Sequence, residues 1–302
     1  MSIVLVENLS KSYGRLTAVD SFGFAARERE IVALVGPDGA GKTSLFRSMC
    51  GLLQFESGRI EIAGYDVVTQ FDRIKEILGY MPQTFSLYSD LSVEENLRFY
   101  AGLFGLDRRQ FDIRKKPLYE FSGLGPFRTR RAGHLSGGMK QKLALSCALI
   151  HNPKVLILDE PTTGVDPLSR RQFWEILKSL RDDGATILIS TPYMDEVARA
   201  DRAVFMHQGK KLAEGTPSEL ARMFTGDVYR VRVEPTPERI RRLSEIEGVD
   251  VRRFGGSIHL YAGGKMTGAA LAAQLDAIGI KADRIDKIPP DLEDTFIQLM
   301  GH

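Results

Sequence analysis

An eight-residue run, GPDGAGKT at positions 36–43, constrains the fold more than any other part of this sequence. It matches G-x-x-x-x-G-K-[ST], follows an apolar run of strand length (Ile31–Val35), and precedes apolar residues at helical spacing. Glycines let backbone N–H groups point into one concave turn, and the start of a helix adds the positive end of its dipole. The sequence therefore predicts a phosphate-binding loop between a buried strand and a helix.

Two side chains of this loop have predicted tasks. Lys42 is expected to reach the β- and γ-phosphates of a nucleotide, and the Thr43 hydroxyl is expected to ligate Mg²⁺. Asp38 is unusual, because an ionised acid would repel phosphate, so we expect its side chain to point outward. A glycine-rich turn without a ligand is the alternative, which the flanking strand and helix disfavour. The predicted nucleotide-binding residues of the loop are Gly36, Pro37, Asp38, Gly39, Ala40, Gly41, Lys42, Thr43 and Ser44.

A second apolar run, Val155–Leu158, ends in two carboxylates, Asp159 and Glu160. Such a strand would place both acids at the carboxyl edge of a sheet, where the phosphate loop also lies. Asp159 is suited to hold Mg²⁺, and Glu160 is suited to polarise an attacking water as a catalytic base. An acidic pair after a strand is often just a solvated edge, but its coincidence with the phosphate loop favours the functional interpretation.

The order of predicted elements indicates two domains. Apolar runs alternate with helical patterns up to about residue 225, which is typical of an α/β fold with a parallel sheet covered on both faces. The stretch from about 85 to 145 is helical and is interpreted as an insertion in that core. From residue 226 to 302 the order is strand, helix, strand, strand, helix, strand and a last helix. We interpret this as a small α+β, ferredoxin-like accessory domain.

Composition excludes several classes of protein. The 302 residues carry 41 Lys+Arg and 39 Asp+Glu, a net charge of +2, so electrostatics gives no reason to expect nucleic acid as a partner. No run approaches the roughly 20 apolar residues that span a bilayer, and the N-terminus does not resemble a signal peptide. Two cysteines are too few for a disulfide framework. We therefore expect a cytoplasmic chain that does not itself span a membrane.

A third motif identifies a family. The run LSGGMKQK at 135–142 opens a helix between the phosphate loop and the acidic strand, and over roughly residues 1–225 the ordered motifs resemble the ATP-binding subunits of ABC transporters. The resemblance implies a P-loop NTPase fold, ATP and Mg²⁺ as ligands, and two such domains meeting head to tail. Ser136, Gly137 and Gly138 would then contact ATP held by the partner subunit. The usual Gln after these residues is Met139 here, which removes one polar contact.

The same resemblance implies roles for three further residues. Tyr13 matches the aromatic residue that stacks on adenine, although a lone Tyr after a strand can simply be a packing residue. Gln83 matches the glutamine that contacts Mg²⁺ and the attacking water, and that links the site to the helical insertion. Asp166 matches the aspartate that communicates across the dimer. It could also cap the proline-started helix that follows, and both roles can hold.

One position departs from the family. After the predicted strand Thr186–Ser190 the family has a histidine that donates a hydrogen bond to the γ-phosphate, whereas this chain has Pro192. Proline offers neither a side-chain donor nor a backbone N–H, and loss of one such donor commonly costs about 10²–10³ in rate. His134, His151 and His207 lie in other motifs and are poor substitutes. We predict an ATP site that hydrolyses slowly, in a hetero- or homodimer with a second ABC ATPase subunit. Pro192 favours the heterodimer, in which the partner is an intact ATPase.

Two segments indicate the subfamily. YSDLSVEENL at 88–97 and PPDLEDTF at 289–296 look like ATPases of the ABC-2 class. That resemblance implies an exporter with separate transmembrane permease subunits and an ATPase held peripherally on the inner face of the membrane. A non-catalytic regulatory subunit of a heterodimeric transporter is the main alternative. A soluble ABC protein of translation or repair is disfavoured, because the chain lacks a second ATPase half, long coiled coils and zinc-binding cysteines. For residues 226–302, dimer support or packing is favoured over ligand sensing.

Overall fold

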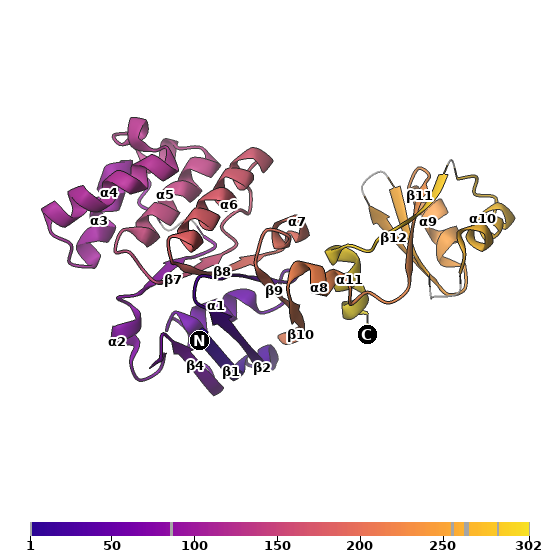
Figure 1. The fold of residues 1–302 in the computed structure, drawn as a ribbon, viewed down its shortest axis with the longest axis horizontal. Helices are drawn as coiled ribbons and strands as arrows, with labels where there is room; N and C mark the ends of the chain where they lie inside the picture. The colour runs from indigo at the N-terminus through magenta and orange to yellow at the C-terminus, as the bar shows by residue number, and fades with distance from the viewer. Residues whose placement is uncertain (1, 85–86, 255–256, 263–265, 283, 302) are drawn as a thin grey trace. The chain divides into compact units, whose positions relative to one another are not determined.

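The computed structural model describes residues 2–84, 87–254, 257–262, 266–282 and 284–301 (Figure 1). The chain divides into two compact units, residues 1–217 and 218–302. The sequence interpretation placed the start of the accessory domain at residue 226, where the composition changes. The second unit begins earlier because the segment before that point bonds to its last helix: the Thr225 N–H donates to Gln298 Oε1 at 2.9 Å, and Thr295 Oγ1 donates to the Ala221 carbonyl at 3.5 Å.

The first unit is built on a six-stranded sheet of order β10-β9-β3-β8-β7-β6. The pairs within β9-β3-β8-β7-β6 are parallel, and β10 runs antiparallel to β9. Every residue of β3 and β7 is buried, which explains why β3 is apolar throughout and β7 is apolar up to its last residue, Asp159. The strands are β3 (Ile31–Val35), β6 (Leu78–Met81), β7 (Val155–Asp159), β8 (Thr186–Thr191), β9 (Arg202–His207) and β10 (Lys210–Gly215).

A second sheet in this unit has the order β2-β1-β4-β5 and is antiparallel. Helix α1 (Lys42–Met49) packs in one core with strands of both sheets, because Leu45, Phe46 and Met49 are buried in the same apolar cluster as Ile60 and Ile157. The start of α1, where the phosphate loop ends, is thereby held firmly. The strands are β1 (Ser2–Tyr13), β2 (Leu16–Arg27), β4 (Ser57–Ile62) and β5 (Tyr65–Asp66).

The insertion is helical, as the sequence predicts, with α3 (Val93–Leu103), α4 (Arg108–Ser122) and α5 (Gly137–Leu149) packed side by side (Figure 1). Ser92 and Asp107 begin α3 and α4 with capping boxes, in which the side chain accepts a backbone N–H that the helix leaves free. α5 also contacts α6 (Pro167–Asp182), so the helix opened by the LSGG run joins the insertion to the core. The short helices are α2 (Phe71–Ile74) and α7 (Met194–Val197), with 3₁₀ turns at Gly125–Phe127 and Ala132–His134.

The second unit carries an antiparallel sheet of order β12-β13-β11-β14 with its own core. Its strands and helices follow one another in the predicted order, and the ferredoxin-like assignment stays a prediction. The last strand, β14, is Arg284–Ile288, and residue 283 before it lies outside the described part. The remaining elements are α8 (Pro217–Ala221), β11 (Asp227–Arg232), α9 (Pro237–Ser244), β12 (Val249–Phe254), β13 (Ser257–Ala262), α10 (Gly268–Ala277) and α11 (Leu292–Met300).

Throughout the described ranges, we find no helix that combines the length and the apolar character needed to cross a membrane.

Candidate nucleotide site

The loop between β3 and α1 needs its glycines for space and for backbone conformation. A Cβ on Gly36 would lie 2.2 Å from the Met206 carbonyl oxygen. Gly41 has φ +107°, and a Cβ there would lie 2.1 Å from the Ala18 carbonyl oxygen. Larger residues are therefore excluded at both positions, for reasons that the neighbouring strands impose.

Lys42, the first residue of α1, fixes a positive charge at this loop. Its Nζ donates to the carbonyls of Gly36 (2.8 Å) and Pro37 (3.1 Å) and lies 3.3 Å from Glu160 Oε1. The residue is only 4% exposed, so the ammonium group is held in place by these oxygens rather than by water. Phosphate oxygens entering the loop would compete with Glu160 for this cation.

A pocket of about 340 Å³ opens beside the loop, and most of the predicted nucleotide-binding residues meet there. Tyr13 lies at this pocket, 47% exposed as a residue, with its hydroxyl 3.4 Å from Ser44 Oγ. Leu16 and Ala18 of β2 also line it, and the sequence analysis missed them because β2 was not predicted. The lining residues are Tyr13, Leu16, Ala18, Asp38, Gly39, Ala40, Gly41, Lys42, Thr43, Ser44, Gln83 and Glu160.

Glu160 is held in an unusual backbone conformation. Its φ is +47°, a left-handed value that costs a residue with a side chain about 1–2 kcal/mol. The Glu160 N–H donates to Ser190 Oγ at 2.9 Å, and the carboxylate Oε2 accepts from Gln83 Nε2 (2.9 Å) and Thr163 Oγ1 (3.3 Å). Strain that is maintained by surrounding bonds is typical of functional positions, and here it aims the carboxylate at the pocket.

Asp159 ends β7 directly beside Glu160 and is completely buried. Its Oδ1 accepts from Ser190 Oγ at 2.6 Å, whereas its Oδ2 has no hydrogen-bond partner. Burial raises the pKa of Asp159, and the neighbouring Ser190 and Thr43 hydroxyls oppose that rise. A cation at Oδ2 would satisfy the buried oxygen and favour the ionised form.

These groups fit Mg²⁺. The Asp159 carboxylate lies beside the Thr43 hydroxyl, and the Gln83 amide lies beside Glu160. Hydroxyl, amide and carboxylate oxygens are the donors that Mg²⁺ prefers, and the unpartnered Oδ2 leaves one of them available. We therefore regard Thr43, Gln83 and Asp159 as candidate ligands.

Ser190 is a site residue that sequence reasoning missed. Its hydroxyl is fully buried and joins both acids, donating to Asp159 and accepting from the Glu160 N–H. The register of the parallel pair β7–β8 places Ser190 opposite Asp159. A serine at the end of an otherwise apolar strand was the available signal, but its partner is 31 residues away and only the strand pairing brings them together.

Ser136, Gly137 and Gly138 do not line the pocket. Ser136 caps α5 by accepting the Met139 N–H at 3.4 Å, and Asp166 caps α6 by accepting the Ser169 N–H at 2.9 Å. Hydrogen bonding to the side chain and the backbone of Ser169 lowers the pKa of Asp166. Gly138 lies close to the start of α6, since a Cβ there would be 2.7 Å from Ser169 Oγ.

The LSGG run and Asp166 thus share a second surface of the unit. Ser136, Gly137 and Asp166 are exposed there, so another molecule can reach them.

Pro192 follows β8 in a loop that is bonded internally. Thr191 Oγ1 donates to Glu196 Oε2 at 2.7 Å and accepts the Tyr193 N–H at 3.1 Å, while the Arg170 guanidinium lies 4.4 Å from the centre of the Tyr193 ring. No histidine lines the nucleotide pocket as the described residues define it.

His151 is instead part of the packing between α3 and the sheet. Its Nε2 lies 3.0 Å from the Leu78 carbonyl oxygen, and its ring stacks on Phe104 with 3.6 Å between ring centres. It is committed to those contacts and does not replace a phosphate donor.

Comparison with known proteins agrees with this geometry. Residues 19–163 match the family model described as "ABC transporter". The Escherichia coli (strain K12) protein named "Probable multidrug ABC transporter ATP-binding protein YbhF" is 40% identical over 238 residues, covering 79% of this chain. This chain spans only 41% of that relative's length.

In two further comparisons, the match extends over most of the length of the similar protein. The "Nod factor export ATP-binding protein I" of Ralstonia nicotianae (strain ATCC BAA-1114 / GMI1000) is 35% identical and matches over 99% of this chain and 94% of its own length. Among solved structures, the "Structure of ATP binding subunit of ABC transporter" superposes with a TM-score of 0.67 at 32% identity, covering 74% of this chain and 93% of that one.

Proposed function

Because the chain belongs to the ABC transporter family of ATP-binding proteins, we propose that it binds and hydrolyses ATP to power a membrane exporter of the ABC-2 class. The observation that carries the proposal is the pocket where the phosphate loop, Gln83 and Glu160 meet beside the buried cation of Lys42. The names of the two relatives, one a multidrug transporter protein and one an export protein, favour export as the direction.

The binding roles follow from position. Tyr13, exposed beside the loop, stacks on adenine, while the backbone N–H groups of residues 36–44 and Lys42 Nζ bind the phosphates. Thr43, Gln83 and Asp159 would hold Mg²⁺, which would supply positive charge to offset the phosphate charge.

The chemical step belongs to Glu160. Its carboxylate accepts the proton of the attacking water, and the Gln83 amide and the Thr163 hydroxyl hold that carboxylate in place. Ser190 keeps the Glu160 backbone in its left-handed conformation. These contacts orient the base before any substrate arrives, which lowers the cost of reaching the transition state.

The chain's own ATP site hydrolyses slowly, because Pro192 supplies no donor to the γ-phosphate. The surface formed by the exposed Ser136 and Gly137 and the half-buried Gly138 can still complete an ATP site on a second subunit, with Asp166 beside it to communicate across the dimer. A heterodimer with an intact ABC ATPase therefore fits best, bound to transmembrane permease subunits on the inner face of the membrane. No nucleic acid is expected as a partner. A purely regulatory ATP-binding subunit is the second candidate, favoured by Pro192 alone.

Turnover of the purified chain tests the proposal. The chain should bind ATP, and Pro192→His should raise turnover by about 10²-fold or more. Glu160→Gln should keep ATP binding and abolish the remaining turnover. Brisk turnover by the unchanged chain would refute the impaired site, and failure to bind ATP would refute the function.

The heterodimer has its own test. A tagged chain purified from membranes should bring down permease subunits and a different ABC ATPase that has the histidine. Recovery of a second copy of this chain in its place would contradict the heterodimer.

A further inference from the structure

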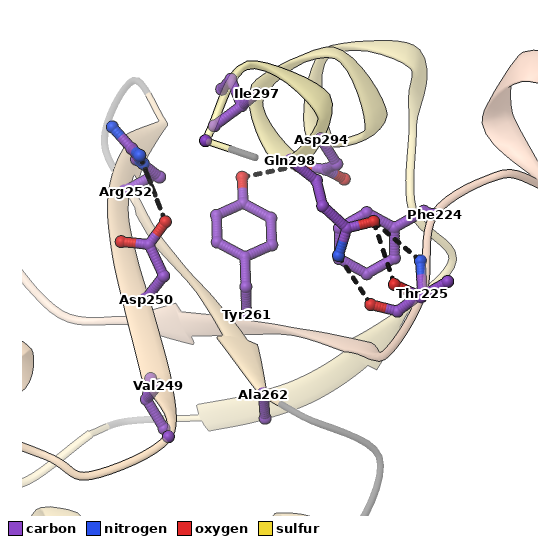
Figure 2. Close-up of a pocket in the computed structure, with 12 residues that line it drawn as sticks. Phe224, Thr225, Val249, Asp250, Arg252, Tyr261, Ala262, Asp294, Ile297 and Gln298 are labelled. Atoms are coloured by element: carbon purple, nitrogen blue, oxygen red, sulfur yellow. Dashed lines mark hydrogen bonds and ion pairs between the residues drawn. The ribbon is translucent and has the colours of Figure 1, made fainter.

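The second unit contains a pocket of about 470 Å³ that the proposed ATPase function does not use (Figure 2). Its size falls within the roughly 300–1,000 Å³ of small-molecule sites. All of its lining residues belong to the unit 218–302, so the pocket is complete within that unit. They come from the segment before β11, from β12 and β13, and from α11.

The walls of the pocket are aromatic and apolar. The rings of Phe224 and Tyr261 lie 5.8 Å apart between centres with an interplanar angle of 49°, and Figure 2 shows them next to each other. Val249 and Ile297 add aliphatic surface from β12 and α11. Aromatic faces carry partial negative charge and attract cations as well as apolar groups.

The polar group that distinguishes the pocket is the carboxylate of Asp294, a lining residue whose side chain is itself fully buried behind the pocket wall. It accepts hydrogen bonds from the Tyr261 hydroxyl at 2.7 Å and the Asp291 N–H at 2.8 Å, and His259 Nδ1 lies 3.6 Å away. The Arg252 guanidinium pairs with a different acid, Asp250, at 3.2 Å. Positive charge in the space next to a buried carboxylate stabilises its ionised form.

Neighbouring acids strengthen this preference. Burial, with the charge of Asp294 as a further cause, raises the pKa of both Asp291 and Glu293 at the start of α11. The ionised forms of Asp291 and Glu293 are therefore already destabilised by the nearby charge of Asp294. An anionic ligand would add to that repulsion, and a cationic ligand would relieve it.

We propose that this pocket binds an organic cation with an aromatic or aliphatic body. The negative charge of the buried Asp294 carboxylate attracts the cation through the pocket wall, and Phe224, Tyr261, Val249 and Ile297 cover the body. A metal ion fits less well, because it needs several oxygen or nitrogen ligands, and no group of three His, Cys, Asp or Glu among the described residues is arranged to hold one. The proposal does not rest on ATP hydrolysis, and it assigns the second unit a ligand-sensing role rather than only support.

The test is a titration of the methyl-labelled full chain, followed by NMR, with three probes of similar size. Benzyltrimethylammonium should shift the Ile297 and Val249 methyl signals saturably and bind about tenfold more tightly than benzyl alcohol, with benzoate the weakest. Equal or tighter binding of benzoate would overturn the proposal. So would shifts centred on methyl groups outside the unit 218–302, or no saturable shift at all.

Matched variants locate the site. Phe224→Ala should weaken binding of the cation about 2- to 30-fold, whereas Met223→Ala, an exposed neighbour outside the pocket, should not. Tyr261→Phe keeps the ring and removes a donor from Asp294, so cation binding should be unchanged or tighter. Equal effects of the first two variants, or strong weakening by the third, would refute the assignment.

Asp294→Asn removes the charge itself and should weaken binding by about tenfold or more. Because Asp294 also helps to cap α11, the methyl spectrum must first show a folded second unit. If that variant does not fold, Phe224→Ala, Met223→Ala and the benzoate comparison decide the question. A folded Asp294→Asn variant that binds as tightly as the unchanged chain would overturn the proposal.

Discussion

Replacing Ser190 with alanine is the sharpest perturbation that the structure offers. The hydroxyl donates to Asp159 Oδ1 at 2.6 Å and accepts the Glu160 N–H at 2.9 Å, and the residue is fully buried. Alanine would leave two buried polar groups without that partner, and each such group costs about 1–3 kcal/mol. We expect the free energy of unfolding of the first unit to fall by about 2–5 kcal/mol.

The same change should weaken Mg²⁺-dependent ATP binding, in a manner that depends on pH. Burial already raises the pKa of Asp159, and the Ser190 hydrogen bond holds that rise back. Without the hydroxyl the pKa rises further, so protons compete better with Mg²⁺ as the pH falls. The Mg²⁺ concentration needed for ATP binding should therefore increase as the pH falls, and more steeply for Ser190→Ala than for the unchanged chain.

Fluorescence of Trp174, the only tryptophan and a buried residue of α6, can follow unfolding of this unit in denaturant. Ser146→Ala is the matched control. Its hydroxyl is also buried but donates only to the Lys142 carbonyl of its own helix at 2.7 Å, so its loss should cost less than about 1 kcal/mol. Equal destabilisation by the two variants, or an unchanged Mg²⁺ requirement, would refute the positioning role of Ser190.

Three further predictions follow from the first unit. Gly41→Ala should destabilise it by at least about 2 kcal/mol and abolish ATP binding, because the new Cβ would lie 2.1 Å from a carbonyl of β2. Gly39 also has a positive φ, +79°, but a Cβ there would meet open space, so Gly39→Ala should destabilise the unit less than Gly41→Ala. Thermal melts of both variants with and without ATP would compare their stability and their ATP binding. Gly138→Ala would place a Cβ 2.7 Å from Ser169 Oγ. It should leave ATP binding intact and lower turnover only in the assembled dimer, as paired binding and turnover assays would show. Burial lowers the pKa of His151 from 6.5 to about 4. The unfolded chain therefore takes up the proton first, and stability should fall by up to about 3 kcal/mol as the pH drops from 6.5 towards 4. In denaturant titrations at several pH values, His151→Asn should lack this part of the pH dependence of the free energy of unfolding.

The parts of the fold that sequence patterns predict are the locally encoded ones. β3 is apolar at every position, and β7 at every position before Asp159, because both faces of the sheet are covered, and that pattern is visible without a structure. The helical insertion is encoded locally by the helical spacing of its apolar residues and by the capping residues Ser92 and Asp107. β2 escaped prediction because its pairing with β1 has several register shifts, which break the regular alternation of a strand.

The phosphate loop and the acidic pair were determined by the sequence alone, because each is a contiguous run whose spacing carries its chemistry. Only the tertiary structure brings the phosphate loop and the acidic pair together. The pairing of β7 with β8 brings Ser190 to both acids, and these contacts hold Glu160 in a left-handed conformation that no local pattern requires. The pocket around Asp294 has the same origin, since its walls come from segments up to 77 residues apart, from Phe224 to Gly301. Contacts between distant segments depend on strand register and helix packing, which a linear pattern does not contain.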